Sequence, residues 1–266
     1  MFFFCNLIYC SSKINIVKLI LLFICVIVLS MRLDLLLVQR GLYPTRARAV
    51  AAIDSGLVTV NGKPAKKPSQ AVEESDELVG CELPYSVGRG SLKLAHALEY
   101  FKVNPNELFC LDVGASTGGF TDVLLKNGAK RVYAVDVGTN QLADDLRNNP
   151  CVISMEQTDI RDVVPVETVD LIVIDVSFIS LTNIVDVLPR WMPKTVIALI
   201  KPQFEVAREV AAKHNGIIKS PQLHQESVAR VVSAFENCGF QLRGVTQSPI
   251  QGGSGNVEFL ACFEIK

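Results

Sequence analysis

A glycine-rich run in the middle of the chain has the residue types of a nucleotide-binding loop. Residues 112–120, Asp-Val-Gly-Ala-Ser-Thr-Gly-Gly-Phe, follow an apolar strand-like stretch and precede a helical one. Glycines at such a turn let the backbone approach a ligand without a Cβ in the way. Ser116 stands where the dinucleotide fingerprint needs glycine, and Phe120 replaces the lysine of a phosphate-binding loop. The run therefore predicts a nucleotide-like ligand without a phosphate chain.

Two acidic residues beyond this loop could bind other parts of the same ligand. Asp136 ends the next strand-like run, where a carboxylate can accept hydrogen bonds from both ribose hydroxyls, and Asp159 follows the third run, within reach of an adenine edge. Alternatively, Gly114 forms a plain tight turn and Asp136 caps a helix, but the joint spacing favours cofactor binding. The expected cofactor contacts are Asp112, Gly114, Ser116, Thr117, Gly118, Gly119, Phe120, Asp136, Val137, Asp159, Ile160 and Asp175.

Two lysines and two carboxylates could carry out chemistry beside this ligand. Asp175 and Lys201 each follow an apolar strand-like run, and open α/β folds place their chemistry at the carboxyl ends of strands. Lys93 lies on the helix before the first strand, and Glu258 begins the last strand. Attack by a ribose hydroxyl on a sulfonium methyl group requires a base, or cations that stabilise the alkoxide. Taken alone, Lys93 could be a solvated helix residue and Glu258 an edge-strand charge.

The residues after Asp175 discriminate between classes of methyl acceptor. An amino-methylating enzyme would have an Asn/Asp-Pro-Pro-aromatic turn here, and a cytosine-C5 enzyme a Pro-Cys pair. This chain has Asp-Val-Ser-Phe at 175–178, and its Pro150-Cys151 pair opens a different strand. Ser177 and Phe178 could line the acceptor pocket, although a phenylalanine such as Phe178 is more often simply a core residue. We therefore expect a hydroxyl acceptor, and we leave open which lysine acts as base.

Alternating strand-like and helical runs predict that residues 92–266 form one α/β domain with helices on both faces of a doubly wound parallel sheet. Expected strands cover residues 109–113, 132–137, 152–155, 169–174, 196–200, 241–246 and 257–263. Expected helices cover residues 92–101, 120–127, 141–147, 181–188 and 223–237, with an irregular loop at 213–221.

Residues 31–81 predict a small separate α+β domain. Residues 32–39 and 45–54 read as two helices, the second with Thr45 as its N-cap, and Asn61-Gly62 is a strong hairpin signal. The Pro- and Gly-rich residues 82–91 predict a linker to the larger domain.

The total charge does not predict nucleic-acid binding, because 26 basic and 27 acidic residues give a net charge of -1. Any RNA-binding face must be local, and the candidates are Arg40, Arg46, Arg48, Lys63 and Arg89. Lys66 and Lys67 fit an ordinary solvated surface. The 8 cysteines and 3 histidines show no metal-ligand spacing, which favours a metal-free protein in a reducing, cytoplasmic compartment.

Residues 1–30 stand apart from this pattern. They contain no acidic residue, and residues 19–29 form an uninterrupted apolar run. The run is short for a membrane span, and no small-residue cleavage site of a signal peptide follows it. We favour translation from Met31, and we expect membrane association only if the segment is expressed.

Together the motifs resemble those of the TlyA-type (haemolysin A) RNA methyltransferases, which join an S4 RNA-binding domain to an FtsJ-like catalytic domain. The resemblance covers Met31 to the C-terminus. The segments that carry it are RLDLLLVQRGLYPTRARAVAAIDSGLVTVNGK, SLKLAHAL, LDVGASTGGFTDVLL, VYAVDVG, VIDVSFISL, LIKPQFE and GNVEFL. One departure is the run at residues 84–90, which is one residue longer than the family's usual junction.

The resemblance implies a Rossmann-like, seven-stranded class I fold that uses S-adenosylmethionine. It also implies that Lys93, Asp175, Lys201 and Glu258 form the catalytic set, with a cytidine 2′-hydroxyl of ribosomal RNA, within an assembled subunit, as acceptor. Two other hypotheses are a membrane-active lysin, as the family's older name suggests, and an RNA-binding protein without catalysis.

Overall fold

The computed structural model describes residues 30–54, 56–81, 90–252 and 255–266. The expectations for residues 1–29 and for the junction at 82–89 lie outside these ranges. Within the ranges, no helix is both long enough and apolar enough to cross a bilayer. The chain divides into two units, residues 1–83 and residues 84–266, and each is described by itself.

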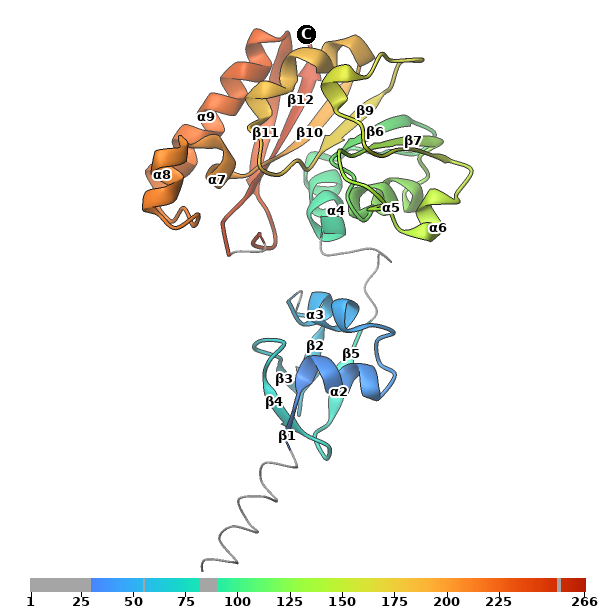
Figure 1. Ribbon diagram of the computed structural model, residues 1–266, viewed down its shortest axis with the longest axis vertical. Helices are drawn as coiled ribbons and strands as arrows, with labels where there is room; N and C mark the ends of the chain where they lie inside the picture. The colour runs from blue at the N-terminus through green and yellow to red at the C-terminus, as the bar shows by residue number, and fades with distance from the viewer. Residues whose placement is uncertain (1–29, 55, 82–89, 253–254) are drawn as a thin grey trace, which may run out of the picture. The chain divides into compact units, whose positions relative to one another are not determined.

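Unit 1 packs two short helices against small antiparallel sheets (Figure 1). Asn61 and Gly62 both have positive φ, 51° and 72°, so the expected two-residue hairpin is confirmed. Thr45 Oγ1 accepts a hydrogen bond from the Arg48 backbone N–H (3.3 Å), which confirms the expected N-cap. Its elements are β1 (Ser30–Arg32), α2 (Leu33–Gln39), α3 (Arg46–Asp54), β2 (Val58–Val60), β3 (Lys63–Pro64), β4 (Ala71–Glu73) and β5 (Leu78–Gly80).

A buried carboxylate fixes the two helices of unit 1 to each other. The Asp34 side chain is fully buried and accepts hydrogen bonds from Arg32 (2.9 Å to each oxygen) and from Arg46 Nε (2.8 Å). These guanidinium groups, Arg32 foremost, lower the pKa of Asp34 to about 2. Apolar side chains from both helices, among them Leu36 and Ile53, form the hydrophobic core of the unit.

Unit 2 is built on one seven-stranded sheet with the order β11-β12-β10-β9-β6-β7-β8. Its elements are α4 (Gly90–Phe101), β6 (Phe109–Val113), α5 (Gly119–Lys126), β7 (Arg131–Val135), α6 (Asp144–Arg147), β8 (Val152–Met155), η1 (Ile160–Asp162), β9 (Leu171–Ile174), η2 (Leu181–Asn183), η3 (Val185–Trp191), β10 (Thr195–Ile200), α7 (Pro202–Glu205), α8 (Arg208–Lys213), α9 (Pro221–Asn237), β11 (Phe240–Gln247) and β12 (Phe259–Ile265). All seven expected strands are present.

The sheet is mixed: the expected parallel arrangement holds for its other strands and is wrong for the last strand, β12. β12 runs antiparallel to both of its neighbours, β10 and β11. The reason lies in the connection from β11 to β12, residues 248–258, which contains no helix among its described residues. Without a crossover helix the chain can only turn back and pair antiparallel.

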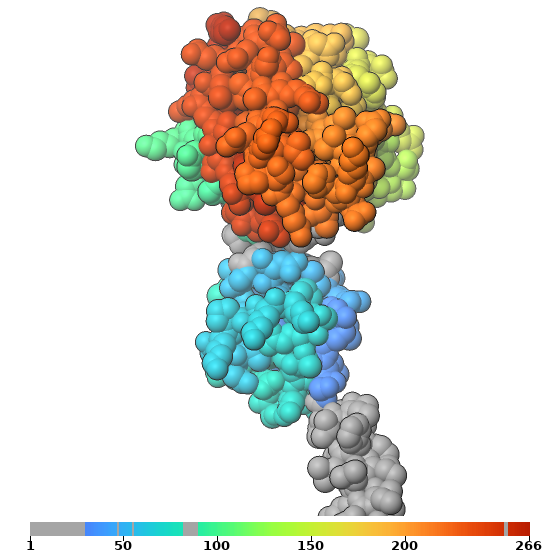
Figure 2. Space-filling view, turned by 90° about the vertical axis from the view of Figure 1, so that its left-hand side faces the viewer, coloured from blue at the N-terminus to red at the C-terminus, as the bar shows by residue number. Residues whose placement is uncertain are grey.

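Two hydrophobic layers cover the faces of the sheet, because successive strand residues point to opposite sides. Cys110 and Val132 pack toward α4 and α5, whereas Leu111 and Tyr133 pack toward the 3-10 segments η2 and η3 and helix α9. Figure 2 presents the face formed by α8 and α9, in orange. The helix-sheet-helix layering confirms the expected Rossmann-like fold class.

Two expected helical segments differ from the structure. Residues 181–188 form two 3-10 segments, η2 and η3, and Pro189 inside η3 has no backbone N–H for a regular helix. Helix α6 begins only at Asp144, because Glu156 Oε1 accepts the N–H groups of Gln141 (2.5 Å) and Leu142 (3.0 Å). Helices α7 and α8 were not expected.

We predict that Asp34→Asn destabilises unit 1 by about 1–2 kcal/mol at neutral pH, because the two arginines lose their charged partner. The folded-state pKa of about 2 lies below the ordinary 3.8, so this contribution is present above pH about 4 and disappears as the pH falls toward 2. The loss of stability is measured by thermal unfolding of the full chain as a function of pH and by hydrogen exchange at the backbone amides of α2. The exposed Asp145→Asn is the control, and equal stabilities at pH 7 would contradict the prediction.

Candidate active site

Two adjoining cavities lie at the carboxyl ends of the central strands, where open α/β sheets bind their ligands. Their volumes are about 300 and 370 Å³, and they share Gly114, Ser116, Asp175 and Ser177. Together they form one trough large enough for a small organic ligand. Most of the expected cofactor contacts line it, namely Gly114, Ser116, Thr117, Gly119, Phe120, Asp136, Val137, Asp159, Ile160 and Asp175.

Two glycines of the loop between β6 and α5 are required by close approaches. Gly114 has φ 84°, and a Cβ on it would lie 2.6 Å from the Asp175 carbonyl oxygen. Gly118 has φ 97°, and a Cβ there would collide with the side chain of Leu146. Gly114 thus lets the loop pass directly over the end of β9. Gly118 lies behind the loop, so its role is packing rather than lining the trough.

Asp136 is fixed by backbone donors at one end of the larger cavity. Its Oδ2 accepts from the Ser116 N–H (2.8 Å), and its Oδ1 accepts from the Gly138 N–H (2.7 Å). Asp159 is clasped by Arg161, whose guanidinium and backbone N–H hold the Asp159 pKa below its ordinary value. The two carboxylates could accept hydrogen bonds from a nucleoside, and the neighbouring Val137 and Ile160 could pack against the faces of its rings.

Asp112 lies beneath the glycine loop and does not line the trough. Its side chain is completely buried, Oδ2 accepts from Thr121 Oγ1 (2.7 Å), and Oδ1 has no hydrogen-bond partner among the described residues. Burial, with smaller contributions from the negative charges of Asp175 and Asp136, raises the pKa of Asp112 to about 7. The carboxyl group therefore holds its proton far more tightly than an exposed aspartate.

Two lysine–carboxylate ion pairs occupy the smaller cavity and its wall. Lys93 Nζ lies 2.6 Å from Glu258 Oε2. Lys201 Nζ lies 2.6 Å from Asp175 Oδ1 and donates a hydrogen bond to Ser177 Oγ (2.7 Å). Both lysine side chains are only 10% exposed. The structure thus brings together all four residues of the expected catalytic set.

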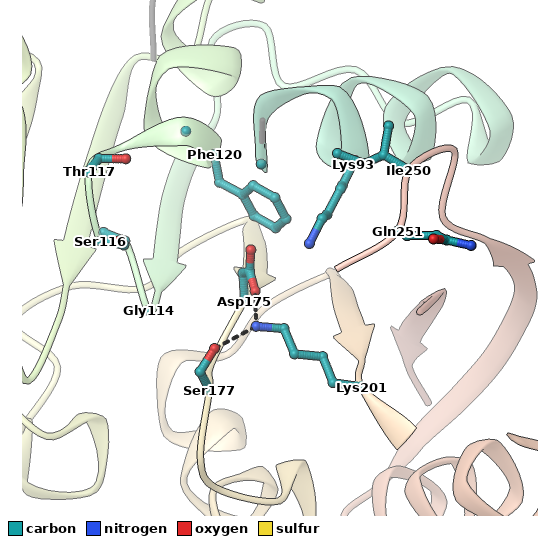
Figure 3. A pocket seen from close by; sticks show the side chains of 13 residues that line it. Lys93, Gly114, Ser116, Thr117, Phe120, Asp175, Ser177, Lys201, Ile250 and Gln251 are labelled. Atoms are coloured by element: carbon teal, nitrogen blue, oxygen red, sulfur yellow. Dashed lines mark hydrogen bonds and ion pairs between the residues drawn. The ribbon is translucent and has the colours of Figure 1, made fainter. Parts of the chain in front are cut away.

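These pairs come from different elements and converge on one point. Lys93 extends from α4, Asp175 follows β9, and Lys201 follows β10, and in Figure 3 the two lysines point toward Asp175. Glu258 precedes β12 and is 3% exposed, so it supports Lys93 from behind. Two ammonium groups in a poorly hydrated cavity stabilise a negative charge that develops between them, and the neighbouring carboxylates can accept a proton.

The sequence interpretation missed some pocket residues and left one undecided. Ile250 and Gln251 of the β11–β12 connection line the cavity with Lys93, and only the pairing of these strands brings them there. Phe178 is 90% exposed with φ 65°, so the alternative of a core residue is wrong. It lines the larger cavity together with Ser177.

The expected RNA-binding residues differ in their exposure and in their hydrogen-bond or ion-pair partners. Arg40 donates to the carbonyl oxygens of Glu74 and Asp76, and Arg46 pairs with Asp34. Arg48 is half-buried, Lys63 is exposed, and Arg89 lies outside the described residues. No group of side chains suited to holding a metal ion occurs in the described parts of the chain.

Comparison with known proteins assigns both units to families. The model of the FtsJ-like methyltransferases matches residues 86–265, and the model of the S4 domain matches residues 31–78. The 16S/23S rRNA (cytidine-2′-O)-methyltransferase TlyA of Mycobacterium tuberculosis is 42% identical over 86% of this chain and 87% of its own length. Hemolysin A of Brachyspira hyodysenteriae is 39% identical over 88% of this chain and its whole length. A solved structure from Streptococcus thermophilus is 43% identical, with a TM-score of 0.68, and the match covers 90% of this chain and 89% of that one.

We predict that Asp112→Asn stabilises the folded protein at pH 8 by roughly 1–3 kcal/mol. Because the pKa of Asp112 is raised to about 7, the wild-type free energy of unfolding falls as the pH rises from about 4 to about 7. Asparagine can keep the hydrogen bond from Thr121 and carries no charge, so this part of the pH dependence should vanish. Thermal unfolding at pH 5 and pH 8 measures it, with Asp145→Asn as control. Parallel pH profiles for wild type and variant would argue against a neutral buried carboxyl.

Proposed function

Since this chain belongs to the TlyA (haemolysin A) family, which joins an S4 domain to an FtsJ-like methyltransferase domain, we propose that it methylates the ribose 2′-hydroxyl of a cytidine in ribosomal RNA. The methyl donor in this proposal is S-adenosylmethionine. The substrate is ribosomal RNA within a ribosomal subunit, which makes the cytoplasm the place of action.

The observation that carries this proposal is the convergence of two buried lysine–carboxylate pairs beside the glycine loop. A ribose hydroxyl is a very weak acid, so its methylation needs nearby cations and a proton acceptor. A nitrogen or carbon acceptor would need other side chains, and Asp-Val-Ser-Phe at 175–178 offers neither the amino-methylating turn nor a nucleophilic cysteine.

The larger cavity fits the adenosine part of the proposed donor. It has carboxylates at its edge, Asp136 and Asp159, and apolar walls that include Val137, Ile160 and Ile179. Asp136 is already oriented by two backbone N–H groups, so it could accept from ribose hydroxyls without rearrangement. When bound, S-adenosylmethionine supplies a methyl group on a positively charged sulfur.

The proposed role of the four charged side chains follows from their positions. The Lys201–Asp175 pair would take up the hydroxyl proton as the ribose oxygen replaces the donor's sulfur on the methyl carbon. Lys93, held by Glu258, stabilises the negative charge that grows on the ribose oxygen. Ser177 accepts from Lys201 and limits the directions in which that ammonium group can point.

We predict that Lys201→Ala and Asp175→Ala each abolish methyl transfer, with turnover at least about 100-fold lower, and leave the protein folded. Purified protein is incubated with radiolabelled S-adenosylmethionine and isolated unmodified ribosomal subunits, and the label is mapped to a nucleotide and to its ribose oxygen. Circular dichroism and the midpoint of thermal unfolding verify the fold.

Two control variants accompany this experiment. Lys213→Ala and Asp145→Ala remove exposed charges of the same types on α8 and α6, and both should retain wild-type turnover. Near-normal turnover of either active-site variant would refute its assigned role. Failure of the wild-type protein to label any ribosomal subunit would refute the proposed function itself.

In unit 1 we propose that both Lys63 and Arg46 contact RNA phosphates. Lys63 is exposed on β3, so Lys63→Ala should weaken binding to ribosomal subunits and reduce the slope of log affinity against log salt by about one. Arg46→Ala should weaken binding and also lower stability, because Asp34 loses a partner. Filter binding between about 50 and 200 mM salt, with Lys266→Ala as control, measures both effects. A slope unchanged by Lys63→Ala would remove that residue from the interface.

A further inference from the structure

Residues 175–181, which run from the end of β9 to the first residue of η2, carry three residues of the proposed site. These are Asp175, Ser177 and Phe178. Phe178 has φ 65° and is 90% exposed, so it adopts a left-handed conformation that a non-glycine residue reaches only at a cost of about 1–2 kcal/mol. Such a conformation persists only where surrounding contacts impose it.

A buried glutamate at the end of α7 bonds to two residues that follow Phe178 in this segment. Glu205 is 3% exposed; its Oε2 accepts from Ser180 Oγ (2.5 Å), and its Oε1 accepts from the Leu181 N–H (3.0 Å). The backbone carbonyl of Glu205 accepts from Arg230 Nη1 (2.7 Å), which ties α7 to α9. The carboxylate is therefore bonded to the far end of the segment that begins at Asp175.

The same helix turn also carries the proposed catalytic lysine. Lys201 is the N-cap of α7, Pro202 is its first residue, and Glu205 is its last. The Phe204 ring lies 5.2 Å from the Phe178 ring and 5.9 Å from Lys201 Nζ. Helix α7 therefore contacts the segment at two points: the Phe204 ring packs against Phe178, and the Glu205 carboxylate bonds to Ser180 and Leu181. Lys201 lies at the start of the same helix.

If this position served only to fill the core, an apolar residue would stabilise the fold more than the buried Glu205 does. The side-chain hydrogen bonds to its carboxylate come from a hydroxyl and a backbone amide, both uncharged. Burial raises its pKa, as expected of a carboxyl group that is poorly compensated. Burying such a group destabilises the fold relative to an apolar residue of similar size, so its presence is best explained by the two bonds it makes.

We propose that Glu205 is a positioning residue that holds residues 175–181 against α7, so that Asp175 and Ser177 meet Lys201 in the geometry for methyl transfer. This inference rests on the proposed function. A displacement of a reacting group by about 1 Å can lower turnover by about 100-fold, which sets the size of the expected effect.

The test compares Glu205→Ala with Glu209→Ala, which removes an exposed carboxylate from α8. With ribosomal subunits as substrate, kcat of Glu205→Ala should fall about 10- to 100-fold, a much larger factor than any loss of affinity for S-adenosylmethionine, because other segments also line the larger cavity. Hydrogen exchange at the Leu181 amide should accelerate, and strands β9 and β10 should stay protected. Glu209→Ala should match wild type in all three measurements.

Two further variants keep the inference testable if Glu205→Ala folds poorly. Glu205→Gln retains an acceptor for one of the two donors and should recover part of the lost turnover. Ser180→Ala removes one donor and should lower kcat, yet it should add little in the Glu205→Gln background, because both changes break the same contact.

Several outcomes would overturn the inference. Folded Glu205→Ala with wild-type kcat would do so, as would parallel losses of kcat, donor affinity and protection across the whole sheet, which indicate a general structural role. If wild-type protein methylates no ribosomal subunit, the proposed function fails instead. The exchange rate of Leu181 then still decides whether Glu205 holds the segment.

Discussion

Two buried ammonium groups can share one cavity only because each has its own carboxylate. A lysine taken out of water without a counterion is disfavoured by several kcal/mol, and two such charges in one pocket repel each other as well. In this protein Lys93 is paired with Glu258, and Lys201 with Asp175. The four side chains come from α4, β9, β10 and the segment before β12, so the site exists only when the whole sheet has assembled.

The direction of the last strand decides whether this arrangement is possible. β12 is antiparallel to β10, with Ile200 opposite Phe259, so the first residues of β12 lie beside the last residues of β10. Glu258 thereby reaches the same edge as Lys201. In a parallel strand of the same seven residues, the beginning would lie at the opposite edge, about 20 Å away. The antiparallel direction of β12 is therefore what places Glu258 at the edge of the sheet where Lys201 lies.

The features that could be predicted from the sequence are those that depend on the pattern of neighbouring residues. The seven apolar runs gave seven strands, and the glycine spacing marked the ligand loop, because alternation and glycine content are properties of neighbouring residues. Contacts between distant segments decided the rest. Glu156 shortens α6, and strand pairing brings Ile250 and Gln251 to the pocket. The exposed Phe178 side chain contacts the Phe204 ring of α7. In unit 1 the count of arginines could not show that Arg46 is paired with a buried aspartate.

Three of the buried carboxyl groups, Asp34, Asp112 and Glu205, differ in the partners of their side chains. Asp34, paired with two arginines in unit 1, has a lowered pKa and stabilises its unit. Asp112 and Glu205, whose side-chain partners are hydroxyls and backbone amides, have raised pKa values. Asp112 accepts from Thr121 just beyond the glycine loop, and Glu205 accepts from Ser180 just beyond the segment that carries Asp175. Each ligand-facing loop is thus held at its far end by a carboxyl group that the fold stabilises poorly. The large apolar layers on both faces of the sheet offset that cost, because their burial is the dominant favourable contribution to folding.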